Sequence, residues 1–119
     1  MVKIRPKTKK IIEGNPVAFA TVGNNKPYVI GTAYCRVVEK NKILITDNFM
    51  NSTIKNILEN NNVALVAWDN KWNGVQIIGK AKYYKKGKWL DFVKNIEENN
   101  GMPSKGAILI KINKIIESK

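Results

Sequence analysis

The chain has 119 residues, enough for one hydrophobic core, and its 44% apolar and 25% charged residues are typical of a folded domain in water. It has no histidine and one cysteine, which excludes Ser-His-Asp and Cys-His catalysis, imidazole zinc sites, disulfide scaffolds and iron–sulfur clusters. The net charge of +12 is the excess of 21 basic over nine acidic residues, and the basic residues are 19 lysines and only two arginines. Because lysine, asparagine and isoleucine are abundant together, we interpret the charge as a basic surface and do not expect nucleic acid as a partner.

Residues 1–13 are basic with isoleucines between the lysines, which indicates an N-terminal arm or a short helix that ends at Gly14. No cationic start precedes an apolar segment, and no apolar run approaches the ~20 residues that a membrane span needs. We therefore expect a single cytoplasmic domain over residues 1–119 without a membrane partner.

Three short segments rich in apolar and β-branched residues follow each other closely, and the turns between them favour an antiparallel meander. The expected strands of this first part are Val17–Val22, Tyr28–Glu39 and Lys42–Thr46, and a fourth is Val63–Trp68. Two further strands are expected at Val75–Tyr84, where Gly79 indicates a bulge or a close backbone approach, and at Ala107–Ile116.

Two segments show helical spacing instead. Ile54, Ile57 and Leu58 predict a short amphipathic helix over about residues 52–61. A second helix is predicted by Trp89, Phe92, Val93 and Ile96, which repeat at helical intervals. The fold class is therefore mainly β (α+β), an antiparallel barrel of six strands with two short helices. Two short helices cannot cover six apolar strands, so we expect a homodimer that buries the remaining face.

The segment Ile45–Ile57 leaves a strand, passes polar residues and enters a helix. Unpaired N–H groups at a helix start can hold a phosphate, and Asn51, Ser52 and Thr53 gather there. Asparagine, serine and threonine are also the preferred helix caps, so the same cluster is explained by a helix that merely begins there.

Four stretches, in order over about residues 14–118, resemble the pyridoxamine-5′-phosphate-oxidase-like flavoproteins, and most closely their small FMN-binding members. The opening hairpin is Val17–Val22 with Lys26-Pro27-Tyr28-Val29, and the phosphate turn and helix are Asp47–Asn61 before Val63-Ala64-Leu65. The later strands are Gln76–Ala81 with Tyr83-Tyr84, and Pro103–Ala107 with Ile110-Lys111-Ile112.

The resemblance implies a six-stranded split β-barrel that dimerises and binds FMN at the dimer interface. It also implies a set of cofactor-binding residues: Gly31, Thr32, Ala33, Thr46, Asp47 and Asn48 along the ring, Asn51, Ser52 and Thr53 at the phosphate, and Lys105 near the flavin. The family usually carries a cation where this chain has Ser52, so Lys55 or Lys105 is expected to compensate. The arginine set that binds pyridoxamine phosphate is not visible, which argues against that activity.

The leading hypothesis is an FMN-dependent reductase or electron carrier that meets a small-molecule or protein redox partner, with no catalytic side chain or metal ligand required. One alternative is the same fold with a deazaflavin. Another is a basic barrel for single-stranded nucleic acid, with Tyr28, Tyr34, Tyr83 and Tyr84 as stacking platforms. Trp72 lies in a polar loop and suggests an interface, whereas Cys35 is expected to pack inside the protein.

Overall fold

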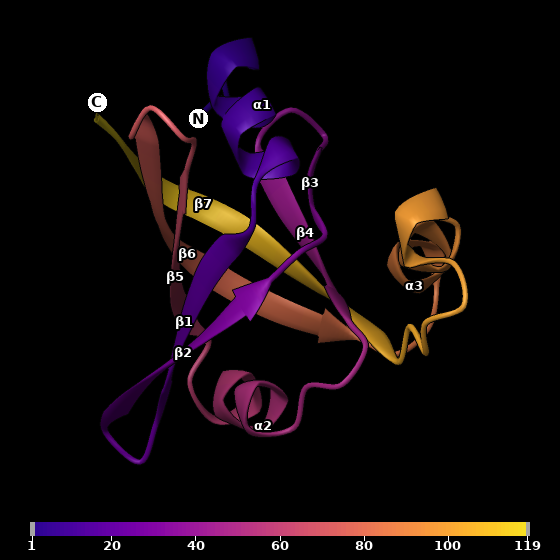
Figure 1. Ribbon diagram of the computed structural model, residues 1–119. Coiled ribbons are helices and arrows are strands. Elements are labelled where there is room, and N and C mark those ends of the chain that lie inside the picture. Colours follow the sequence, from indigo (N-terminus) through magenta and orange to yellow (C-terminus); the bar gives the residue numbers. More distant parts are fainter. Residues whose placement is uncertain (1, 119) are drawn as a thin grey trace.

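Alternating buried and partly exposed side chains, clearest in β1 and β6, build one curled antiparallel sheet (Figure 1). The computed structural model describes residues 2–118. Its strands are β1 Val17–Gly23, β2 Lys26–Thr32, β3 Cys35–Val38, β4 Lys42–Asp47, β5 Asn62–Trp68, β6 Gly74–Tyr84 and β7 Gly106–Ser118. Its helices are α1 Pro6–Gly14, α2 Ser52–Glu59 and α3 Lys88–Lys94, followed by a 3₁₀ turn at Glu97–Asn99.

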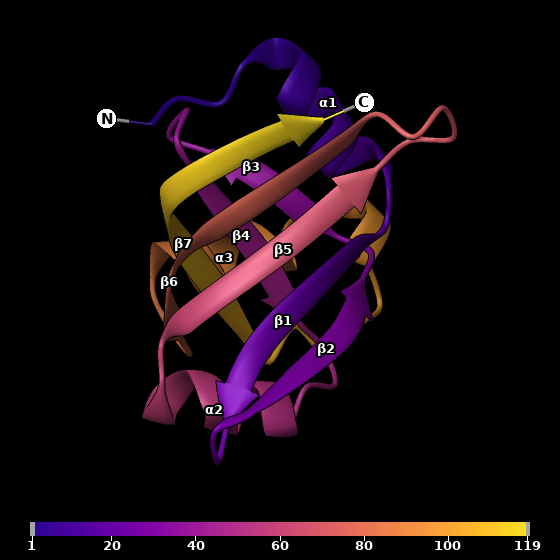
Figure 2. The same ribbon diagram turned by 90° about the vertical axis from the view of Figure 1, so that its left-hand side faces the viewer.

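The two edges of the sheet are formed by strands that are neighbours in sequence. The strand order is β2-β1-β5-β6-β7-β4-β3, and all pairs are antiparallel. Only Ala33 and Tyr34 join β2 to β3, so the two edges lie within about 10 Å of each other at this crossing. The sheet therefore curls into a half-barrel that is split between β2 and β3 (Figure 2).

The prediction of six strands is wrong: the described part of the chain has seven, because the expected run Tyr28–Glu39 divides into β2 and β3. Thr32 still pairs with Val17 of β1, whereas Cys35 pairs with Ile45 of β4. The chain changes partners between these two positions, and a run of β-favouring residues does not reveal such a change.

The prediction of two helices is also too low, since the basic N-terminal segment forms α1. Pro6 occupies the first turn, where its missing N–H costs nothing, and Ile11 and Ile12 are buried against the barrel. α2 covers the opposite end of the barrel, and α3 lies outside, against β7 and β4 (Figure 1). No helix within residues 2–118 has the length and apolarity to cross a membrane.

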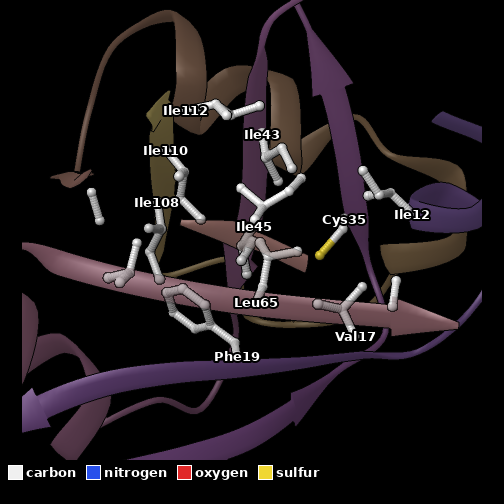
Figure 3. Packing of buried hydrophobic residues seen from close by; sticks show 14 of the residues in the cluster. Ile12, Val17, Phe19, Cys35, Ile43, Ile45, Leu65, Ile108, Ile110 and Ile112 are labelled. Atoms are coloured by element: carbon white, nitrogen blue, oxygen red, sulfur yellow. The ribbon is translucent and has the colours of Figure 1, made fainter. Parts of the chain in front are cut away.

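The barrel interior is filled by apolar side chains from most strands and from the first two helices (Figure 3). Phe19, Ile43, Ile45 and Ile108 are completely buried there. A second cluster lies under α3, where Leu90, Val93 and Ile96 are the buried residues while Phe92 stays 42% exposed. The buried stripe of this helix is therefore shifted from the predicted one, and α3 itself ends before Ile96.

Gly79 lies where the register between β6 and β7 shifts, as expected for a bulge. A Cβ atom at this position would collide with the backbone carbonyl of Lys111. The glycine is therefore required by the close approach of the two strands, and both parts of the prediction are confirmed.

Candidate functional site

A cavity of about 560 Å³ lies at the split of the barrel, between the β2–β3 crossing, the end of β4 and the start of α2. Its position follows from the topology, because both sheet edges end here and no strand fills the gap. It brings together eight of the ten residues predicted from the sequence: Gly31, Thr32, Ala33, Thr46, Asn48, Asn51, Ser52 and Thr53.

Apolar side chains form the remaining wall of this cavity: Ile30, Tyr34, Phe49, Met50 and Met102. Phe49 is 69% exposed and Met102 is 40% exposed, so both leave apolar surface open at the cavity. Of these five, sequence reasoning singled out Tyr34 alone. The signal that the sequence offered for Phe49 and Met102 was a large apolar residue among polar and turn residues.

No residue that lines this cavity, within the described part of the chain, carries a charge at neutral pH. Its polar groups are hydroxyls, side-chain amides and backbone, and none is an acid or base suited to proton transfer near pH 7. The cavity can therefore bind and orient a molecule, and redox or group-transfer chemistry there has to come from that molecule.

The hydroxyl of Thr46 is the most informative polar atom of the cavity. Thr46 is 6% exposed, and its Oγ1 has no hydrogen-bond partner among residues 2–118. Leaving a buried hydroxyl unpaired costs about 1–3 kcal/mol, so a native protein rarely keeps one without a use. A ligand with a hydrogen-bonding edge would satisfy this atom.

The start of α2 forms the other end of the cavity. Asn51 holds the capping position, but within residues 2–118 its side chain accepts no capping hydrogen bond, and Lys55 N donates to Asn51 O at 3.1 Å. Ser52 is exposed and Thr53 is buried. The interpretation of Asn51 as a simple side-chain cap is therefore not supported, and the first N–H groups of α2 receive no side-chain acceptor from this residue.

Asp47 and Lys105, the other two predicted residues, lie in a neighbouring cavity of about 390 Å³ that shares Met50 and Asn51 with the first. The Asp47 carboxylate accepts hydrogen bonds from Met50 N at 2.8 Å and from the Tyr83 hydroxyl at 2.6 Å. The Lys105 amine donates to Met50 O at 3.0 Å and lies 3.9 Å from Asp47 Oδ1. Both side chains therefore hold the turn between β4 and α2 from the second cavity and do not line the first one.

Burial, together with the hydrogen bond to the negative Asp47 carboxylate, raises the pKa of Tyr83 well above its ordinary value. The tyrosine thus remains a donor to Asp47 throughout the neutral range.

Tyr83 and Tyr84 are successive residues of β6 and point to opposite faces of the sheet. The four tyrosines therefore do not form one stacking platform.

Two other residues singled out in the sequence do not line this cavity. Trp72 is 73% exposed in the β5–β6 loop and stacks on Trp68, with ring centroids 6.4 Å apart and planes within 4°. Cys35 is 1% exposed in the core, and burial raises its pKa to about 11. The prediction that this cysteine packs inside the protein is confirmed.

The chain is similar in sequence to known proteins of one family. Residues 4–119 match the family model of pyridoxamine 5′-phosphate oxidase. An uncharacterised protein of Methanocaldococcus jannaschii is 37% identical over 124 aligned positions, which cover all of this chain and 83% of that protein.

Solved structures share the fold, and two of them serve as examples. HupZ from Group A Streptococcus superposes with a TM-score of 0.88 at 18% identity, covering 98% of this chain and 94% of that chain. An FMN-binding protein from Syntrophomonas wolfei subsp. wolfei superposes with a TM-score of 0.76 at 16% identity, covering 93% of this chain and 83% of that chain. At these identities the likeness establishes the architecture alone.

Proposed function

Because this chain belongs to the pyridoxamine 5′-phosphate oxidase family, we propose that the cavity at the barrel split binds FMN and that the protein is a small flavin-dependent oxidoreductase or electron carrier. The observation that carries the proposal is one cavity that holds both the buried Thr46 hydroxyl, which has no partner among residues 2–118, and the start of α2, where Asn51 makes no side-chain cap. The volume of about 560 Å³ lies in the range of small-molecule sites. One solved protein of the same fold is an FMN-binding protein, which supports this choice of ligand.

The ring of the flavin would lie at the Thr46 end. Thr46 Oγ1, the Asn48 amide and the backbone of Gly31 to Ala33 supply hydrogen-bonding groups there. Phe49 and Met102 supply apolar surface for an aromatic ring. FMN itself supplies the electron or hydride transfer, which suits a cavity that lacks side-chain acids and bases.

The phosphate would lie at the start of α2, near Asn51, Ser52 and Thr53. The partial positive charge of the helix start and the hydroxyls of Ser52 and Thr53 would hold it. The Lys105 amine contacts this turn at Met50 O, whereas Lys55 lines neither of the two cavities. Lys105 is therefore our candidate for the cation that Ser52 does not provide.

The protein would act as a homodimer. The outer face of β1 and β5 carries the small residues Ala18, Ala20 and Ala64, with Val66 and Ile78 each 38% exposed beside them. Such a flat apolar face suits close packing against a second copy. Gly31, which pairs with Ala18 and lines the cavity, connects this face with the flavin site.

The test is a fluorescence titration of the purified apoprotein with FMN, riboflavin and a 5-deazaflavin. We expect FMN to bind in the micromolar range or tighter, and Thr53→Ala to weaken FMN about ten- to hundredfold while riboflavin changes little. Equal losses for FMN and riboflavin would assign Thr53 to helix stability instead. Absence of FMN binding, with tight deazaflavin or oligonucleotide binding, would contradict the proposal.

A further inference from the structure

A connecting arm of the chain, residues 95–105 between α3 and β7, is fastened to the flavin cavity by a pair of side-chain amides, of which Asn99 is buried and Asn48 half-buried. Asn48 Nδ2 donates to Asn99 Oδ1 at 2.7 Å, and Asn99 Nδ2 donates back to Asn48 Oδ1 at 3.2 Å. Asn99 is only 2% exposed, although it lies in a short 3₁₀ turn at the periphery of the fold. Each amide thus donates one hydrogen bond to the other and accepts one from it.

The far end of the arm is held to the same turn. Asn99 Nδ2 also donates to Ser104 Oγ at 2.8 Å, and Ser104 N donates to Asn48 Oδ1 at 3.0 Å. Ser104 adopts a φ of 48°, which non-glycine residues rarely accept without compensating contacts. Lys105 N donates to Asp47 O at 2.8 Å. The arm is therefore anchored at Asn99 and at residues 104–105, and both anchors reach the segment 47–48.

Met102 lies between these anchors and lines the cavity. Its backbone N–H donates to Asn99 O at 3.1 Å. Asn99 does not line the cavity, whereas Asn48 and Met102, which are hydrogen-bonded to it, both do. Any influence of Asn99 on a bound molecule therefore passes through these two residues.

We propose that Asn99 is a positioning residue of the flavin site, which holds the Asn48 amide and the Met102 side chain against the bound flavin. The inference rests on the proposed function, and it adds a residue that does not itself touch the ligand. Beyond the 3₁₀ turn the arm has no regular structure, so without Asn99 it would open locally at low cost. Asn48 would then lose its amide partner, and Met102 would leave the wall of the cavity.

The experiment compares wild type, Asn99→Ala, Met102→Ala and the double variant by FMN titration and by the absorption and fluorescence spectra of bound FMN. Asn100→Ala is the matched control, since Asn100 is the adjacent asparagine but is exposed. Limited trypsin digestion of the apoproteins, followed by mass spectrometry, measures opening of the arm at Lys94 and Lys105. Ser104→Ala, which removes one acceptor of Asn99, provides a milder variant if Asn99→Ala does not fold.

We expect Asn99→Ala to weaken FMN binding about tenfold, to shift the spectra of bound FMN and to speed cleavage of the arm, with Asn100→Ala like wild type. Because Asn99 acts partly through Met102, the double variant should lose less affinity than the two single losses combined. Wild-type affinity and spectra in a folded Asn99→Ala, or in Ser104→Ala, would overturn the positioning role alone. A wild-type protein that binds no FMN would instead overturn the proposed function.

Discussion

At the scale of single residues, Thr46 links stability to binding. Its hydroxyl is buried without a partner among residues 2–118, so Thr46→Val should leave the apoprotein as stable as wild type or up to about 1 kcal/mol more stable. The same change should weaken FMN binding about tenfold, because the ligand loses one hydrogen bond. Urea unfolding and FMN titration measure the two effects. A variant that is less stable and binds FMN normally would show that the hydroxyl serves the fold.

Cys35 makes the stability of the protein depend on pH. Burial raises its pKa to about 11, above the 9.0 of a free thiol, so the folded state favours the protonated form. This contribution is complete below pH 9 and is lost as the pH rises through about 11. Wild type should lose about 2–3 kcal/mol relative to Cys35→Ala over that interval.

Urea unfolding of both proteins at several pH values gives the difference, in which the titration of the lysines cancels. Cys35→Ala will be less stable than wild type at pH 8, since it leaves a small gap in the core. Only the change of this difference with pH tests the thiol, and parallel curves from pH 8 to pH 11 would refute its shifted pKa.

At the scale of elements, the β6–β7 pair depends on Gly79. A methyl group there meets the carbonyl of Lys111 in the neighbouring strand, and backbone cannot move aside as a flexible side chain can. Gly79→Ala should therefore lower the free energy of unfolding by at least about 2 kcal/mol. Gly14→Ala is the matched control, because a Cβ at Gly14 meets nothing within 4 Å. Similar urea midpoints for the two variants would contradict this view of the bulge.

The turn between β4 and α2 tests which lysine supports the phosphate. Lys105→Ala should weaken FMN binding and flatten its dependence on salt, because a cation near the phosphate is removed. Lys55→Ala removes the same charge from a residue that lines neither cavity and should leave both quantities close to wild type. FMN titrations at two salt concentrations decide the question. A gain of tenfold or more for Ser52→Lys, with neither alanine variant affected, would show that no lysine compensates.

At the scale of the whole molecule, the apolar outer face of β1 and β5 predicts the dimer. Val66→Glu places a charge in the middle of this face, and the cost of burying it without a partner should shift the protein to a monomer. Leu58→Glu is the control, since Leu58 is a 70% exposed apolar residue on α2. Light scattering at micromolar concentration measures the molar mass of wild type and of both variants. A wild-type monomer, or a dimer that survives Val66→Glu, would remove this face from the proposal.

Local chemistry predicted much of this protein from the sequence alone. The strands other than β2 and β3 appear within one or two residues of their expected bounds, because period-two alternation and turn residues act over a few positions. α2 and the bulge at Gly79 follow for the same reason. Eight site residues that the family resemblance implied meet in one cavity. Their place came from the order and spacing of the family's motifs, because the local pattern did not reveal the end of β2 beside Gly31 and Thr32.

The tertiary structure decided what depends on distant partners. The run Tyr28–Glu39 divides because β2 joins β1 while β3 joins β4, and this choice depends on how the sheet closes. Asp47 and Lys105 stand behind the cavity because Asp47 finds the Tyr83 hydroxyl on β6, 36 positions away. Asn99 contributes to the site through an amide pair with Asn48, 51 positions earlier in the chain. Such contacts form only when the barrel has closed, so a pattern within a short stretch of sequence cannot predict them.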